Sequence, residues 1–378
     1  MGRFGRGVIA STLLLFVAAS AAAQDARPAE KAPSIYDKIW KFSDWYDSES
    51  NPVVQKILFT GRYQQDFATI GADQGDMSEW NVRRLRLGPR ITLFRHYLVH
   101  AEVELNPQER DPFYMRITDA YVSWSKHPNA AIAIGKQSVP FTQEGATSSK
   151  DLITIDRSNL ANNIWFTQEY MPGISASGRV SAWTYRAGIY SAGAANREFG
   201  EFNGGLFTLG VVGYDFAKKL GVREAVLTGD YVYQHPDRRN TFTKRFEQIA
   251  SLNFKLESGR WGLRSDLSRT TGYLGQSGIF AVMAMPSFHV TSRLEVVARY
   301  TFLDSDEVNG LGLATYENRI SHGAGDRYNE AYLGVNYYFY GHKLKLQSGL
   351  QFADMRDLAD DGGAYHGTSW TTGLRIGW

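Results

Sequence analysis

From residue 57 onward, the chain is built of short segments in which apolar and polar side chains alternate. Residues 293–303 are an example, with Leu294 and Val296 alternating with Glu295 and Arg299. Alternation with a period of two places the two sets on opposite faces of a β-strand. About sixteen such segments follow one another, and most are close to the 9–11 residues that a tilted membrane-spanning strand needs. The pattern predicts an all-β protein.

The connections between these segments alternate between long and short. The long ones are residues 68–80, 106–114, 138–173, 191–205, 235–245, 304–326 and 354–367, and the short ones include 95–96, 126–129, 258–259, 291–292 and 341–342. Short turns at one end with longer loops at the other are typical of transmembrane barrels, whereas a secreted sandwich gives no reason for this division. We predict a transmembrane antiparallel β-barrel of about sixteen strands over residues 57–378, with the last strand paired to the first.

The N-terminus carries an export signal. Arg3 and Arg6 precede an apolar core at 8–19, and Ala21 and Ala23 provide a cleavage site before Gln24. We therefore expect residues 1–23 to be a cleaved signal peptide.

Residues 24–56 do not alternate and are predicted to be a periplasmic N-terminal extension. Ile35, Ile39, Phe42 and Tyr46 recur at helical spacing, which predicts a short amphipathic helix there. The alternative is that this extension partly plugs the barrel.

Composition and motifs exclude several other classes of protein. The formal charge of +2 comes from the two arginines of the signal peptide, so the mature chain lacks the basic bias of a nucleic-acid binder. There is no Cys, and hydrolase, zinc-protease and P-loop motifs are missing, while the His residues are scattered. We expect no enzyme activity, no cofactor and no metal site.

One connection, residues 139–172 (the long loop), is too long for a hairpin turn. Its apolar side chains, which include Phe141, Trp165 and Phe166, must be buried. Inside a wide barrel they would narrow the bore, so we expect a constriction loop that folds inward. Its charged residues are Glu144, Lys150, Asp151, Asp156, Arg157 and Glu169.

Basic residues gather on the inward face of the first two and last two strands, which closure of a barrel makes neighbours. This predicted basic wall consists of Arg62, Arg84, Arg86, Arg90, Lys343, Lys345 and Arg375. Because like charges in a narrow bore repel one another, we expect the acidic loop to face this wall. The resulting electric field across the bore, positive at the wall and negative at the loop, would give a modest anion preference. The loop's acidic excess does not supply the convergent cations that a phosphate filter needs.

The last segment has alternate apolar residues and ends on an aromatic side chain, Trp378. A terminal aromatic residue on the last strand resembles the signal that outer-membrane assembly machinery reads. Outer-membrane lipids and this machinery are therefore expected partners.

Several motifs between residues 81 and 178 resemble the phosphate-selective porin O and P family. They are G-K-Q-S-V-P-F at 135–141, T-S-S-K-D at 147–151, D-R-S at 156–158, the Arg-rich N-V-R-R-L-R-L-G-P-R at 81–90 and D-A-Y-V at 119–122. The resemblance implies a sixteen-stranded porin in the outer membrane of a Gram-negative bacterium. It also implies a homotrimer and an anion channel.

We therefore expect passive diffusion of small hydrophilic solutes, with a preference for anions such as phosphate. The alternative is a non-conducting barrel with a structural or adhesive role, whose lumen is filled by the loop and the N-terminal segment. The width of the bore distinguishes them, because barrels of 16–18 strands normally keep an aqueous channel.

Overall fold

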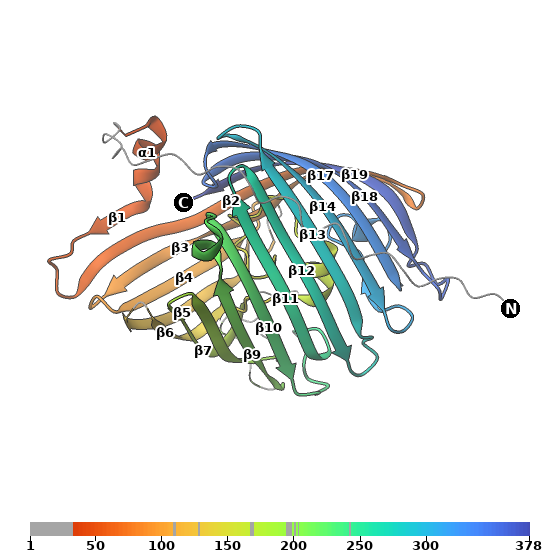
Figure 1. Cartoon of the computed structure of the whole chain (residues 1–378), viewed down its shortest axis with the longest axis horizontal. Helices are drawn as coiled ribbons and strands as arrows, with labels where there is room; N and C mark the ends of the chain where they lie inside the picture. Colours follow the sequence, from red (N-terminus) through yellow and green to blue (C-terminus); the bar gives the residue numbers. More distant parts are fainter. Residues whose placement is uncertain are drawn as a thin grey trace. The chain divides into compact units, whose positions relative to one another are not determined.

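The computed structural model describes residues 33–108, 111–127, 129–166, 170–193, 199, 202, 204–241 and 243–378 (Figure 1). The chain forms two compact units, Met1–Ile39 and Trp40–Trp378. Of the first unit, residues 33–39 are described, so the expected signal peptide lies outside the described residues.

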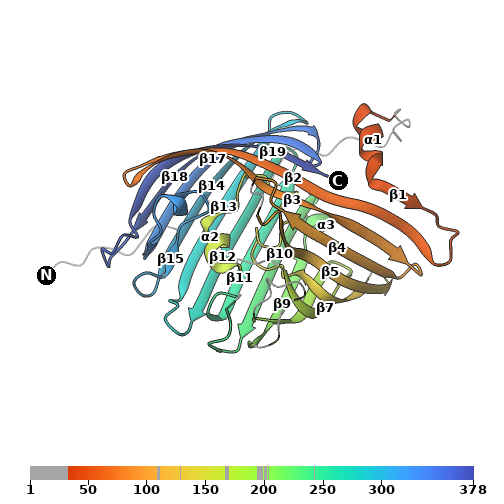
Figure 2. The same ribbon diagram turned by 180° about the vertical axis from the view of Figure 1, so that it is seen from behind.

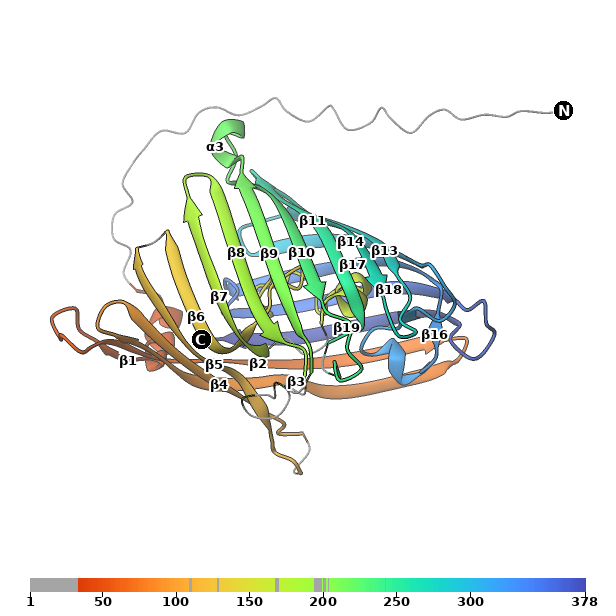
Figure 3. The same cartoon turned by 90° about the horizontal axis from the view of Figure 1, so that it is seen from below.

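The second unit is a closed antiparallel barrel, which confirms the predicted fold (Figures 1 and 3). Each strand pairs with its neighbour along the chain, and the described residues provide sixteen wall strands. They are β2 (Val54–Ala72), β3 (Gly75–Leu93), β4 (Tyr97–Leu105), β5 (Tyr114–His127), β6 (Ala130–Ser138), β7 (Tyr170–Val180), β8 (Trp183–Ser191), β9 (Leu206–Asp215), β10 (Glu224–Gln234), β11 (Phe246–Ser258), β12 (Trp261–Gly272), β13 (Ile279–His289), β14 (Leu294–Ser305), β17 (Arg327–Tyr340), β18 (Leu344–Arg356) and β19 (Tyr365–Gly377).

The last strand closes the barrel against the first, as predicted. Strand β19 pairs with β2 from Gly367↔Ala72 to Gly377↔Arg62. The final residue continues the ladder, because Gly61 and Trp378 exchange two backbone hydrogen bonds of 3.1 Å each. Closure leaves the wall without a free edge along this seam.

The expected helix is shorter than its spacing predicted. Helix α1 covers Ile35–Trp40, a 3₁₀ turn η1 covers Lys41–Ser43, and Tyr46 lies in a short strand, β1 (Asp44–Asp47). Strand β1 pairs with β2 at residues 56–58, beyond the end of β19. Because β3 holds the other edge of β2 there, β1 covers backbone groups that would otherwise be an open sheet edge.

The prediction of a long connection at residues 68–80 was wrong. Strands β2 and β3 are 19 residues each and run through this range to a tight turn at Asp73 and Gln74. The inner face of β2 there carries buried Ala68 and Ile70, which pack in an apolar cluster with Tyr316. That apolar packing supports strand structure where the polar turn residues suggested a loop.

The remaining connections follow the expected division. The end with short turns includes the hairpin between β17 and β18, where Gly341 has a φ of 52°, and a small helix, α3 (Ala217–Leu220), between β9 and β10 (Figure 3). The longer connections, including the long loop and residues 306–326, start from the other end. Transmembrane barrels keep their short turns on the periplasmic side.

Candidate functional site

The long loop contacts inner-facing side chains on well-separated strands of the wall. Its Thr142 amide donates to Asp230 Oδ2 on β10 at 2.8 Å. Asn336 on β17 donates to the carbonyl oxygen of Ile153 at 2.8 Å, and Arg375 on β19 donates to that of Ile155 at 3.2 Å. A segment that reaches all three strands must cross the interior, and Figure 2 shows its helix α2 (Asn159–Ile164) among the strands.

Aromatic side chains anchor the two ends of this loop. The rings of Phe141 and Phe166 are 5.1 Å apart in an edge-to-face contact, and Phe166 meets Phe207 of β9 at the same distance. Trp165 donates from its indole nitrogen to the Val139 carbonyl oxygen at 2.9 Å. Burying a side chain of this size contributes roughly 1.5–3 kcal/mol, so these contacts hold the loop in one position.

A buried ion-pair network ties the loop to β14. Arg299 Nη1 lies 3.4 Å from Glu144 of the loop, and its Nε lies 2.7 Å from Glu330 of β17. Arg299 also donates to the Asp156 carbonyl oxygen at 2.9 Å. The three charged side chains are no more than 2% exposed. Sequence analysis placed Glu144 in the loop and Arg299 on the polar face of its strand, but it did not predict that the two pair.

Five members of the predicted basic wall are buried on the inner face. They are Arg62, Arg84, Arg86, Lys345 and Arg375.

Three of these five buried cations pair with carboxylates on strands of the wall. Arg86 pairs with Glu104 at 3.0 Å, Arg62 pairs with Glu102 at 3.2 Å, and Arg375 pairs with Asp66. The expected compensation by loop carboxylates is thus supplied at these three arginines by carboxylates on β2 and β4.

Lys345 and Arg62 do contact the long loop, but through neutral groups. Lys345 donates to the Leu152 carbonyl oxygen. Arg62 donates to the Ser149 hydroxyl at 2.6 Å.

The other two members of the predicted wall lie elsewhere. Arg90 is exposed near the short-turn end of β3. Lys343 is exposed in the turn between β17 and β18, where its ammonium lies 5.5 Å from the centre of the Tyr340 ring. The alternation that placed Lys343 inward stops at the strand end, so it is not part of the buried wall.

The predicted loop charges also divide among different environments. Asp151 is exposed, and Glu169 lies outside the described residues. Lys150 donates to the Trp378 carbonyl oxygen at 2.7 Å. Arg157 donates to the carbonyl oxygens of Glu144 and Thr147 at 2.8 and 2.9 Å.

Asp156 faces an arginine that sequence analysis missed. Arg83 Nε lies 3.3 Å from Asp156 Oδ1, because a register shift between β2 and β3 lets Arg83 point inward beside Arg84. Strict alternation would have placed Arg83 toward lipid, where an arginine is strongly disfavoured. This conflict was the available signal for a β-bulge.

A second loop, residues 306–326, also packs inside the barrel and was not predicted to do so. It contains β15 (Leu311–Gly312), η2 (Glu317–Arg319) and β16 (Ala324–Gly325). Tyr316 donates to Asp66 of β2 at 2.8 Å, and Asn163 of α2 donates to the Gly312 carbonyl oxygen at 2.9 Å. The second loop therefore connects α2 to the wall strand β2.

Three cavities lie beside the long loop. The arginine cavity, about 290 Å³, lies toward the long-loop end and is lined by Arg83, Arg84, Arg86, Glu104, Arg116, Asp156, Arg157, Ala161, Asn162, Trp165, Phe166 and Thr315. The middle cavity, about 180 Å³, includes Arg62, Ser149, Arg157 and Trp165 in its lining. The short-turn cavity, about 530 Å³, includes Arg186, Glu224 and Lys255.

Neighbouring cavities share lining residues. Arg157 and Trp165 line both the arginine cavity and the middle cavity. Pro140, Ala146 and Thr147 line both the middle cavity and the short-turn cavity. The three cavities thus form a series along the barrel, and residues of the long loop line each of them.

The electrostatic environment shifts the pKa of loop groups beside the passage. Burial alone would raise the pKa of Asp156, but Arg83, Arg84 and Arg375 together lower it. Burial and the nearby Arg62 lower the pKa of Lys150 to about 8. Asp156 is therefore ionised at neutral pH, and Lys150 is mostly protonated.

The described residues contain no group of three or more His, Cys, Asp or Glu side chains placed to hold a metal ion. Within the same part of the chain, no helix is long and apolar enough to cross a membrane.

Solved structures with a similar fold include a porin and an outer-membrane channel. The anion-selective porin from Comamonas acidovorans has 16% sequence identity and a TM-score of 0.61, covering 85% of this chain and 99% of that one. Pseudomonas putida OprB has 10% identity and a TM-score of 0.61, covering 91% and 96%. The channel DcaP of Acinetobacter baumannii has 13% identity and a TM-score of 0.57, covering 88% and 99%. A comparison with curated proteins found no match.

The closed sixteen-stranded barrel with cavities along its interior, together with a family match over more than half of the chain, identifies an outer-membrane porin of a Gram-negative bacterium. This fold indicates a channel rather than an enzyme. More particularly, the family model for phosphate-selective porin O and P matches residues 57–259. The chain belongs to this family, which confirms the resemblance found in the sequence motifs.

Proposed function

We propose that this porin mediates passive diffusion of small hydrophilic solutes through the three cavities, with a moderate preference for anions. The observation that supports it most directly is the lining of the arginine cavity. Its described residues include five arginines but two carboxylates. A low-dielectric wall around a narrow space focuses the field of such charges and concentrates anions.

The preference is expected to be moderate because the arginines already have partners. Arg83 and Arg86 pair with carboxylates, and Arg157 donates to two loop carbonyl oxygens. A strong oxyanion site needs donors that converge on the ligand instead. Phosphate would then pass as one of several small anions.

The reversal potential in a KCl gradient tests this role. Asp156→Asn removes a carboxylate from the arginine cavity and should increase the preference for chloride. Asp151→Asn is the matched control, because Asp151 is exposed and does not line that cavity. Equal effects of the two substitutions would show that the arginine cavity does not determine selectivity.

The alternative function is a non-conducting structural barrel. Its support is the apolar cluster that fills part of the interior, in which Met283 and Met285 of β13 pack with Ile164 of α2 and Leu311 of the second loop. In a planar bilayer, purified protein that inserts without opening channels would favour this alternative over diffusion.

The assembly of the porin is also part of the proposal. Residues 1–23 would direct export and be removed. The N-terminal extension, predicted as residues 24–56 but ending before β2 begins at Val54, would lie in the periplasm. Trp378 would be recognised by the outer-membrane assembly machinery, and three barrels would associate in the lipid as a homotrimer. Intact mass of the extracted protein and its mass in native detergent complexes test these steps.

A further inference from the structure

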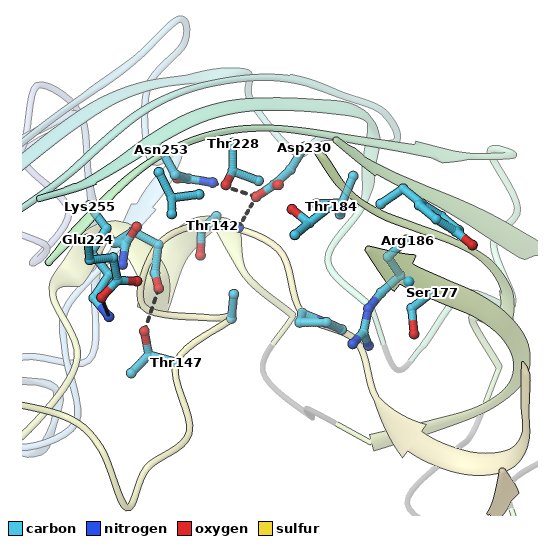
Figure 4. Close-up of a pocket in the computed structure, with 17 residues that line it drawn as sticks. Thr142, Thr147, Ser177, Thr184, Arg186, Glu224, Thr228, Asp230, Asn253 and Lys255 are labelled. Atoms are coloured by element: carbon cyan, nitrogen blue, oxygen red, sulfur yellow. Dashed lines mark hydrogen bonds and ion pairs between the residues drawn. The ribbon is translucent and has the colours of Figure 1, made fainter. Parts of the chain in front are cut away.

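The short-turn cavity has a different chemistry from the arginine cavity. Figure 4 shows its lining, in which Arg186 extends from β8 while Glu224 and Lys255 lie together on the opposite side. Lys255 Nζ is 2.7 Å from Glu224 Oε2, so these two charges neutralise each other. Arg186 lies apart from this pair.

The strand register places the polar residues of this cavity in two rows. One row runs from Ser177 on β7 to Arg186 on β8, and then through Val211 on β9 to Asp230 on β10. The adjacent row runs from Thr184 on β8 through Gly213 on β9 to Thr228 on β10. Paired side chains on one face are about 4.5–5.5 Å apart, so each row spans the width of a small organic solute.

Four of these polar side chains have unused hydrogen-bonding capacity. Within the described residues, Arg186, Ser177, Thr184 and Thr228 have no side-chain hydrogen bond and no ion pair. Asp230, in contrast, accepts from the Thr142 amide at 2.8 Å and from Asn253 at 2.6 Å, both through Oδ2 (Figure 4). Its Oδ1 remains an acceptor for a hydroxyl group.

A glycine keeps the second row open. A Cβ added at Gly213 would lie 2.5 Å from the Thr184 hydroxyl and 3.1 Å from the Thr228 hydroxyl. A side chain there would fill the space between the two hydroxyls. The absence of a side chain at Gly213, the floor of the cavity, therefore leaves room for a ligand to contact both the Thr184 and the Thr228 hydroxyl.

We propose that the short-turn cavity is a binding site for hydroxylated organic monoanions, of the sugar-acid type. The carboxylate of the solute pairs with Arg186 and the Ser177 hydroxyl. Its hydroxyl groups exchange hydrogen bonds with Thr184, Thr228 and Asp230 across the Gly213 floor. This inference rests on the proposed diffusion function and adds a solute class to it.

The arrangement suits this class better than an inorganic oxyanion. A compact phosphate would use the single guanidinium but leave the hydroxyls of the second row without a partner. An unsubstituted fatty acid would pair with Arg186 and place an alkyl chain against those hydroxyls. Each alternative leaves polar groups unsatisfied, which weakens binding.

Single-channel recording in planar bilayers tests the site. Gluconate added to KCl should interrupt the chloride current with resolvable block. Hexanoate, which lacks the hydroxyls, and sorbitol, which lacks the charge, should block at least about tenfold less at equal concentration. Equal block by gluconate and hexanoate would overturn the proposal, even where chloride selectivity is as proposed.

Two variants locate the block in this cavity. Arg186→Gln and Gly213→Ala should each weaken gluconate block by about tenfold or more, because the first removes a charge-assisted contact and the second fills the floor. Arg179→Gln is the matched control, since Arg179 is exposed, pairs with Asp215 at 2.7 Å and does not line the cavity. If Arg186→Gln retains wild-type block while conducting chloride normally, the site is not where gluconate binds.

Discussion

The guanidinium carbon of Arg157 lies 4.6 Å from the centre of a Trp165 ring. Both residues belong to the long loop, and both line the arginine cavity and the middle cavity. The stacking and the two carbonyl contacts of Arg157 hold its charge where one cavity meets the next. A solute that moves between these cavities must pass this side chain.

Replacing Arg157 should change selectivity at this point. A unit charge about 4 Å from an ion changes the energy of that ion by about 1 kcal/mol in water, with opposite sign for chloride and potassium. Arg157→Gln should therefore reduce the chloride-to-potassium permeability ratio by up to about thirtyfold. Arg157→Lys keeps the charge and should retain most of the preference. Reversal potentials in a KCl gradient measure the ratio, and equal effects of Gln and Lys would indicate a purely steric role.

Replacing Arg299 should destabilise the barrel and release the loop. Arg299→Met leaves Glu144 and Glu330 buried without their cation, and breaking a buried pair from one side costs about 3–5 kcal/mol. Arg327→Met removes an exposed pair with Asp304 and should cost less than about 1 kcal/mol. Unfolding by urea in detergent compares them, and similar midpoints would mean that the buried network contributes little.

The second loop should make stability depend on pH. Burial raises the pKa of Glu317 from 4.5 to about 7. Between these values the folded state binds more protons than the unfolded state, so stability falls as pH rises from about 4.5 to about 7 and is then constant. The loss is roughly 3 kcal/mol, from 1.36 kcal/mol per pKa unit.

Glu317→Gln tests this dependence. Glutamine keeps an acceptor for Gln351 and Ser369, which donate to Glu317 at 2.7 and 3.3 Å. Thermal unfolding in detergent at pH 5 and pH 8 should show a smaller decrease for the variant than for the wild type. An identical decrease in both proteins would assign the pH effect to other groups.

The wall of the barrel could be predicted from the sequence because it is determined by patterns within single strands and their connections. Alternation along each strand and the order of long and short connections determine the strand count and the closure of β19 on β2. The N-terminal sequence was harder to interpret, since Tyr46 joins β1 only because β2 extends past the end of β19. That open edge is visible only in three dimensions.

The arrangement of side chains inside the barrel could not be predicted in the same way, because it depends on contacts between segments that are distant in the sequence. The inward side of Arg83 follows from a bulge, and the buried position of Tyr316 follows from packing on β2 and α2. Arg90 lies near the short-turn end of β3 and Lys343 lies in the turn before β18, and both side chains are exposed. Alternation within the strands therefore predicts the face of a side chain only where the register is regular, and it predicts neither the depth of the side chain nor its partners.

The salt dependence of the wild-type reversal potential tests the proposed function most directly. The Debye length, over which salt screens a charge, falls from about 10 Å at 0.1 M to about 3 Å at 1 M. The charges around the arginine cavity should therefore influence ion selectivity mainly at low salt. We predict channels that prefer chloride over potassium in dilute KCl gradients and lose most of this preference near 1 M. A preference for potassium, or no channels at all, would contradict the assignment of an anion-preferring porin.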